Sequence, residues 1–204
     1  MTVWVVKLGG SLANSEELPR WLDVIAAAGA GKVVLVPGGG PWADEVREAQ
    51  KREGFDDRVA HRKALRAMGQ YAQMLIGIQS GLVAAASMEA IHRVLGQGEI
   101  PVWMPYDMVV ADPAIPESWD VTSDSLAAWL AGRLRAQGLA LAKSVEVGGG
   151  RVDAMEMVER GWVDACFPRF VAAAGCAVHV MSRDGYERFG RMLKPGIGVI
   201  AGGW

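Results

Sequence analysis

Hydrophobic and polar residues are arranged in blocks along this chain, and the blocks predict strands and helices in alternation. Apolar runs rich in β-branched residues lie at positions 3–6 and 33–36, and a glycine cluster follows each run closely. Such runs predict buried strands that end in turns. Apolar residues at helical spacing follow at 16–28, 42–52 and 57–79. Strand and helix thus alternate, which predicts an α/β fold: a three-layer αβα sandwich around a mostly parallel sheet.

The rest of the chain continues the same alternation. We predict further strands at 100–104, 139–146, 176–181 and 197–200, and further helices at 87–95, 123–134, 156–163, 168–174 and 186–193. Prolines lie at positions 105, 113 and 116, so we expect residues 106–117 to form a loop over a cleft.

Glycine clusters follow two of the predicted strands and carry the first chemical signal. Lys7 precedes the glycines at 9–10, and three more glycines occupy 38–40. A glycine turn between a strand and a helix leaves backbone N–H groups free to bind an anion, and the helix N-terminus adds positive potential. One such turn is usually only a turn. Two turns at the ends of neighbouring parallel strands would face each other across one cleft, so together they predict a phosphate site with Lys7 as an added point charge.

Composition narrows the class of protein. The chain has 204 residues, of which 51% are hydrophobic, which suits one domain with a sizeable core. The net charge of −2 gives no indication of nucleic-acid binding. Without a basic leader or a long apolar run, we expect a cytoplasmic protein that does not contact a membrane. Cys166 and Cys176 are expected to be reduced core thiols. Eight tryptophans are many for this length and suggest a subunit interface in a homo-oligomer.

The two glycine motifs resemble those of a known family. Lys-x-Gly-Gly-Ser at 7–11 and Pro-Gly-Gly-Gly at 37–40 are similar to motifs of the amino acid kinase family, which includes acetylglutamate, aspartate, uridylate and isopentenyl phosphate kinases. The resemblance runs from residue 3 to about residue 200. No P-loop pattern and no protein-kinase motif is present. The resemblance implies an ATP- and Mg²⁺-dependent small-molecule kinase of one domain, 1–204, with an acceptor lobe at about 1–135 and a nucleotide lobe at about 136–204.

The resemblance also implies roles for particular residues. Thr-Ser-Asp-Ser at 122–125 matches the family's acidic position, so Asp124 would orient two lysines, Lys7 and Lys143, that act on the transferred phosphoryl group. An ordinary helix cap would explain the same four residues. At the end of the strand predicted at 139–146 the family usually has the motif Leu-Thr-Asp, and Lys143 departs from this motif. Mg²⁺ would be held through the ATP phosphates, with no protein ligand assigned. The residues implied in nucleotide or phosphate binding are Gly9, Gly10, Ser11, Gly39, Gly40, Ser144 and Lys194, and a glycine loop at 148–150 would lie near the base or ribose.

The acceptor side resembles one small branch of the family more closely. Ala60-His61 with Ala64 and Ala67-Met68, and the Trp-Asp-Val-Thr-Ser-Asp-Ser run at 119–125, are similar to enzymes that phosphorylate an aminomethyl-furan-methyl phosphate on the route to methanofuran-type cofactors. The substrate-binding residues this implies are Gly38, Asp44, His61, Arg62, Thr122 and Ser123. His61 and Arg62 would meet the acceptor phosphate. Plainer interpretations are a structural histidine at 61 and, at Asp44, a carboxylate that the helix dipole favours.

Two other functions remain open on the sequence. Within the same fold, the acceptor could be a carboxylate, which would give an acyl phosphate. A non-catalytic member could instead store or sense an anion or a nucleotide. The presence of Lys7, both glycine turns and Asp124 together favours an enzyme.

Overall fold

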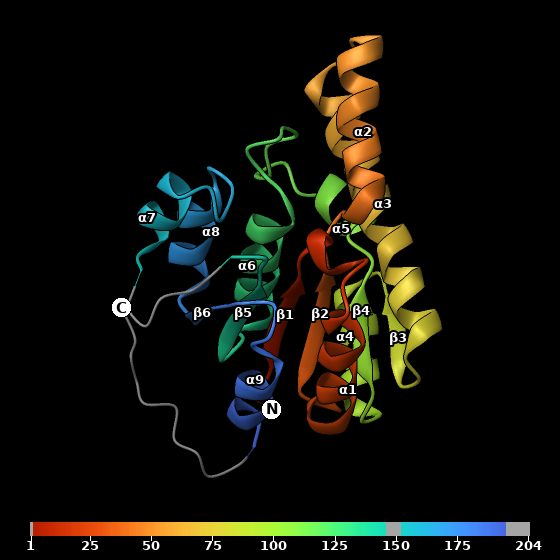
Figure 1. Ribbon diagram of the computed structural model, residues 1–204, viewed down its shortest axis with the longest axis vertical. Coiled ribbons are helices and arrows are strands. Elements are labelled where there is room, and N and C mark those ends of the chain that lie inside the picture. The colour runs from red at the N-terminus through yellow and green to blue at the C-terminus, as the bar shows by residue number, and fades with distance from the viewer. Residues whose placement is uncertain (1, 146–151, 195–204) are drawn as a thin grey trace.

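A six-stranded parallel sheet forms the centre of the protein (Figure 1). The computed structural model describes residues 2–145 and 152–194. The strands are β1 (Trp4–Leu8), β2 (Val33–Pro37), β3 (Leu82–Ala85), β4 (Ile100–Trp103), β5 (Gly138–Ala142) and β6 (Ala177–Met181), in the order β3-β4-β2-β1-β5-β6. Each neighbouring pair is parallel. The predicted αβα sandwich around a parallel sheet is confirmed.

Helices connect the strands and cover both faces of the sheet. They are α1 (Glu17–Gly29), α2 (Gly40–Glu53), α3 (Asp57–Ile78), α4 (Met88–Gly96), α5 (Tyr106–Val110), α6 (Ser123–Leu134), α7 (Ala154–Glu159), α8 (Phe167–Ala174) and α9 (Tyr186–Met192), with a short 3-10 helix, η1, at Gly10–Leu12. Buried side chains of α1 and α9 form one apolar cluster with one face of the sheet, and those of α4, α6 and α8 form a second cluster on the other face. The long helix α3 contributes to both.

The central strand β1 sets the position of Lys7. Side chains alternate along a strand, so Trp4, Val6 and Leu8 pack with the α1 cluster, whereas Val5 packs with the α6 cluster. Lys7 is two residues from Val5 on the strand, so its side chain points to the same face of the sheet, toward α6.

Strand register brings three strand ends to one level. Leu8 at the end of β1 pairs with Pro37 of β2 and with Ala142 of β5. The residues that follow these strands, including both glycine turns and Lys143, therefore meet at the carboxyl edge of the sheet. This is the edge where open parallel sheets bind ligands.

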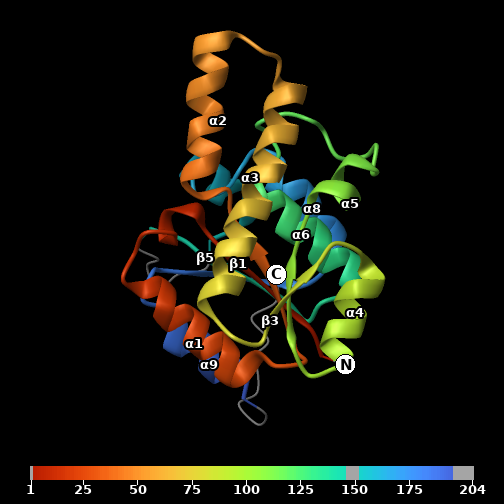
Figure 2. The same cartoon turned by 90° about the vertical axis from the view of Figure 1, so that its right-hand side faces the viewer.

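A hairpin of α2 and α3 extends beyond this carboxyl edge (Figures 1 and 2). Gly54 ends α2 in the left-handed conformation, with a φ of 73°, and the Asp56 side chain caps α3 by accepting a hydrogen bond from Val59 N at 2.8 Å. Because α2 begins at Gly40, directly after the second glycine turn, its first turns lie at the edge where the strands end.

Some elements differ from the prediction. The short, alanine-rich β3 was not predicted, and α5 lies within the segment predicted as a loop. Strand β5 ends at Ala142 rather than at residue 146, and β6 is an edge strand that is half buried rather than buried. The predicted loop at 148–150 and strand at 197–200 lie outside the described residues. Over the part of the chain that the structure describes, every helix is too short or too polar to cross a bilayer.

Candidate active site

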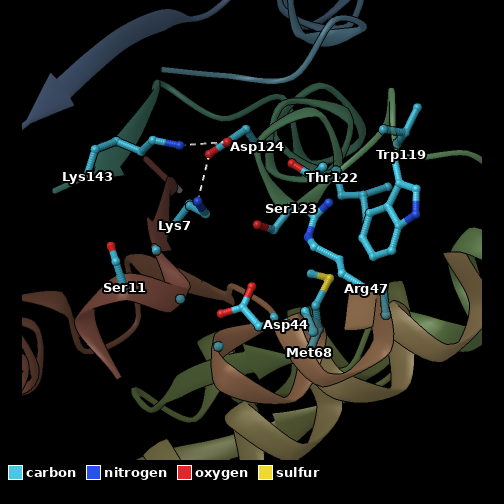
Figure 3. A pocket seen from close by; sticks show the side chains of 18 of the residues that line it. Lys7, Ser11, Asp44, Arg47, Met68, Trp119, Thr122, Ser123, Asp124 and Lys143 are labelled. Carbon is cyan, nitrogen blue, oxygen red and sulfur yellow. Dashed lines mark hydrogen bonds and ion pairs between the residues drawn. The ribbon is translucent and has the colours of Figure 1, made fainter. Parts of the chain in front are cut away.

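One cavity of about 410 Å³ lies at the carboxyl edge of the sheet, between the glycine turns, the α2–α3 hairpin and the start of α6 (Figure 3). Most of the predicted site residues line it. They are Lys7, Gly9, Gly10, Ser11, Gly39, Gly40, Asp44, His61, Thr122, Ser123, Asp124, Lys143 and Ser144.

The two predicted lysines share one carboxylate in this cavity (Figure 3). Lys7 Nζ lies 2.8 Å from Asp124 Oδ1 in an ion pair, and Lys143 Nζ donates a hydrogen bond to Asp124 Oδ2, also at 2.8 Å. The three side chains come from β1, from the first turn of α6 and from the end of β5. The Lys7 and Asp124 side chains are only 4% and 6% exposed, so water screens their interaction weakly.

Burial and pairing shift the pKa values of this trio. Burial, the largest effect, lowers the pKa of Lys7 to about 8, with Asp124 opposing the shift and Lys143 adding to it. For Asp124, burial alone would raise the pKa, but the charges of Lys7 and Lys143 outweigh it and hold the pKa below its usual value. Lys7 therefore depends on Asp124 to stay charged near neutral pH.

The two glycine turns pack directly against each other. A Cβ on Gly10 would lie 2.5 Å from Gly40 N, and a Cβ on Gly38 would lie 2.5 Å from Gly10 N. Side chains at these two positions would force the turns apart. Gly40 also has a φ of 58°, which disfavours other residues. Glycine at positions 10 and 38 thus allows the two turns to contact each other.

The opposite wall of the cavity contains a cation that the sequence did not reveal. Arg47, on α2, stacks on the ring of Trp119 with its guanidinium carbon 3.8 Å from the ring centroid. In Figure 3 its side chain points from α2 toward Thr122 and Ser123. Trp119 is itself held by a 2.7 Å hydrogen bond from its Nε1 to Gln50 Oε1. Within residues 2–145 and 152–194, Arg47 has no carboxylate at ion-pair distance, so its N–H groups remain available.

Two hydrogen-bond acceptors line the same cavity. Asp44 lies beyond the first turn of α2, because the helix begins at Gly40, so the dipole explanation for this carboxylate loses its basis. His61 Nδ1 lies 3.1 Å from Ser118 O, which can only accept, so Nδ1 carries the hydrogen. His61 Nε2 then carries the lone pair, and no other described residue bonds it. Burial lowers the pKa of His61, which favours the neutral ring over the cation expected from the sequence.

Three predicted site residues lie outside the cavity lining. Arg62 is paired with Glu117, at 2.5 Å from Nε and 3.1 Å from the second nitrogen. Lys194 is exposed and does not line the cavity. Gly38 packs against the first turn, and its N–H donates to Leu8 O at 2.8 Å. Of these two arginines, Arg47 lines the cavity and Arg62 does not.

Comparison with known sequences assigns this chain to a protein family, and the fold agrees with that assignment. Residues 2–147 match the amino acid kinase family, so the chain belongs to that family. It is also similar to the [5-(aminomethyl)furan-3-yl]methyl phosphate kinase of Methanocaldococcus jannaschii, with 26% identity over 143 residues. The matched region is 70% of this chain and 66% of that relative, slightly under two thirds of its length.

Solved structures of similar fold include two kinases whose names give a small phosphorylated substrate. Uridylate kinase from Archaeoglobus fulgidus superposes with a TM-score of 0.72 at 18% identity, over 95% of this chain and 96% of that one. An isopentenyl phosphate kinase gives a TM-score of 0.57 at 18% identity, over 94% and 96%. At these identities the likeness establishes the fold.

Proposed function

We propose that this protein is an ATP-dependent kinase that transfers the γ-phosphoryl group to a small phosphomonoester and so forms a diphosphate. The observation that carries the proposal is the Lys7–Asp124–Lys143 trio, which lies beside both glycine turns within one cavity. Two ammonium groups and backbone N–H groups are suited to the negative charge of phosphate oxygens. The relative from Methanocaldococcus jannaschii supports an acceptor of the aminomethyl-furan-methyl phosphate type, in methanofuran-type cofactor biosynthesis.

The cavity residues would act by positioning and by neutralising charge. An oxygen of the acceptor phosphate attacks the γ-phosphorus of ATP, the bond to the β–γ bridging oxygen breaks, and ADP leaves. A phosphate oxygen is already ionised at neutral pH, so the reaction needs no general base. This agrees with Asp124, whose two oxygens are both engaged by lysines. Lys7 and Lys143 neutralise charge on the transferred group, and the glycine turns donate N–H groups to its oxygens.

The Mg²⁺ that the family resemblance implies would be bound through the nucleotide. The described residues contain no group of three acidic, histidine or cysteine side chains that could hold a metal ion. The lysines and N–H groups of the lining suit phosphate oxygens instead. We propose that Mg²⁺ is held chiefly by ATP phosphates and water, where it would neutralise charge. ATP would lie on the β5 side, in a nucleotide lobe at about 136–204, with the acceptor in the lobe at about 1–135.

The opposite wall of the cavity offers groups for both ends of an aminomethyl-aryl phosphate. Arg47 can place two N–H groups on acceptor phosphate oxygens, because a guanidinium forms paired hydrogen bonds with such oxyanions. Asp44 can accept a hydrogen bond from an ammonium group, and the buried His61 ring lies in the same cavity lining. These assignments replace the predicted pairing of His61 and Arg62 with the acceptor phosphate.

A panel of acceptors tests the reaction. We expect ATP turnover with small aminomethyl-aryl phosphates and none with aspartate or glutamate, measured by ADP release with hydroxylamine present. A diphosphate product does not react with hydroxylamine, whereas an acyl phosphate gives a hydroxamate. Hydroxamate from an amino acid would show a carboxylate acceptor. Tight ATP binding without turnover on any acceptor would favour the non-catalytic alternative.

Arginine variants test the acceptor wall. We expect Arg47→Ala to raise the acceptor KM by about ten- to a hundredfold, since hydrogen bonds to charged groups contribute about 1.5–3 kcal/mol each. The ATP KM should change by less than about threefold. Arg62→Ala is the matched control, because this arginine pairs with Glu117 outside the cavity. A larger acceptor effect for Arg62→Ala than for Arg47→Ala would contradict the assignment.

A further inference from the structure

A carboxylate from a distant part of the chain holds the start of α6. Asp164 lies between α7 and α8, about forty residues after α6 begins. Its Oδ2 accepts hydrogen bonds from Thr122 N at 2.9 Å, from Thr122 Oγ1 at 2.8 Å and from Ser125 N at 3.1 Å. Its Oδ1 accepts a hydrogen bond from Ser125 Oγ. Burial raises the pKa of Asp164, whereas the hydrogen bonds from Ser125 and Thr122 lower it and favour the ionised carboxylate. The two backbone N–H groups can only donate, which also suits the ionised form.

This contact replaces the usual cap of the helix. Thr122 is the N-cap residue of α6, but its side chain makes no capping hydrogen bond to the helix. Its hydroxyl donates to Asp164 instead, and the Asp164 carboxylate takes the place of the cap, with its negative charge at the positive end of the helix dipole. The same segments are joined again where Cys166 N donates to Asp120 O at 3.0 Å.

The first turn of α6 that Asp164 holds also contains Asp124. Asp164 bonds residues 122 and 125, and Asp124 lies between them, with its own carboxylate directed to Lys7 and Lys143. Ser125 is fully buried, so its hydroxyl has no access to water and depends on Asp164. A shift of this turn would move Asp124 relative to both lysines. Small displacements of catalytic groups reduce rates strongly, by about a hundredfold for 1 Å.

We propose that Asp164 is a positioning residue for phosphoryl transfer, which holds the first turn of α6 so that Asp124 lies between the two lysines. This rests on the proposed kinase function. Asp164 makes no hydrogen bond or ion pair with the three side chains of the trio, so it acts through the backbone of α6 and through its charge. The negative charges of Asp164 and Asp124 both favour the protonated form of Lys7. The positive charge of Lys143, the other charged group that faces Lys7, disfavours it.

The variant Asp164→Asn tests the proposal, because asparagine keeps the size and loses both the charge and part of the accepting capacity. We expect kcat to fall by about ten- to a hundredfold, with the ATP KM changed by less than about threefold. The control is Ser87→Ala, which removes the cap of α4, a hydrogen bond from Ala90 N at 3.2 Å, at a residue that does not line the cavity. It should lower the melting temperature and leave kcat unchanged. An equal loss of kcat in both variants would contradict the positioning role and would show that Asp164 only caps the helix.

A second measurement does not depend on turnover. Competitive labelling with acetic anhydride across a pH series, read by mass spectrometry, reports the pKa of Lys7 in each variant. We expect the pKa of Lys7 to fall in Asp164→Asn and to stay constant in Ser87→Ala. If wild type fails to turn over ATP but the Lys7 pKa still falls in Asp164→Asn, the proposed function fails while the link from Asp164 to the trio stands. An unchanged Lys7 pKa and an unchanged kcat would overturn the proposal.

A milder variant covers the case in which Asp164→Asn does not fold. Ser125→Ala removes one of the four hydrogen bonds to Asp164 and leaves both carboxylates in place. Ser125 does not line the cavity, so an effect on kcat would travel through the first turn of α6. We expect a severalfold loss of kcat with a nearly constant ATP KM. Wild-type kcat in folded Ser125→Ala, with Asp164→Asn unfolded, would count against the proposal.

Discussion

Replacing Lys7 with methionine is expected to lower kcat on the order of a hundredfold while the protein still folds. Methionine fills a similar volume on β1 and removes the ammonium that lies 2.8 Å from Asp124. In a site that excludes water, one such charge contributes about 3 kcal/mol to transition-state stabilisation. The fold keeps the remaining pair between Asp124 and Lys143. Steady-state kinetics and thermal unfolding of the purified variant provide the measurements.

The pH dependence of the wild-type enzyme gives the same prediction a second check. In the proposed mechanism Lys7 acts in its protonated form, and burial lowers its pKa to about 8. The ATP kcat/KM should therefore decrease as pH rises through about 8, and Lys7→Met should lack this decrease. Bound ATP adds negative charge that favours the protonated lysine, so kcat should decrease only at higher pH. Lys32→Met, at an exposed lysine before β2, is the control, and near-normal turnover in Lys7→Met would contradict the role of Lys7.

Replacing Asp124 with asparagine is expected to have the largest effect of any single change at this site. Two ammonium groups would lose the one carboxylate that they share, and each would lie near a like charge in a buried position. Leaving a buried charge without its partner costs about 3–5 kcal/mol, which the protein can relieve by deprotonating Lys7. Either outcome removes the charge that catalysis needs. We expect kcat to fall by more than about a hundredfold, and the melting temperature to fall as well.

The structure separates this prediction from the simple capping interpretation. Asparagine caps helices as well as aspartate does, so a cap at position 124 would tolerate the change. Asp124, however, lies inside the first turn of α6, and Asp164 takes the place of the cap. Glu89→Gln is the matched control, since Glu89 is a first-turn acid on α4 whose side chain is exposed. Wild-type kinetics in Asp124→Asn would remove Asp124 from the mechanism.

The local sequence determined most of the helices and strands and both glycine turns of this protein. Apolar runs that end in glycine predicted β1 and β2 and the turns after them, because burial and backbone conformation are properties of short segments. Family motifs added Asp124 and Lys143 to Lys7, and the structure brings the three together. Short or weakly patterned elements such as β3 and α5 escaped prediction, since a few residues carry too little periodicity to distinguish strand, helix and loop.

Only the tertiary structure decided which charged side chains are available to a ligand. Arg62 looked suitable from the sequence, but Glu117, 55 positions away in the chain, holds it outside the cavity, whereas Arg47 stacks on Trp119 and faces inward. The cap of α6 likewise comes from Asp164, which follows Thr122 by 42 positions. Ionic and hydrogen-bonding partners depend on distance and burial after folding, and the spacing of residues along the chain does not encode either. The amino acid sequence therefore predicted the glycine turns and the three residues of the lysine–aspartate trio, and folding determined which charged side chains of the opposite wall face the cavity.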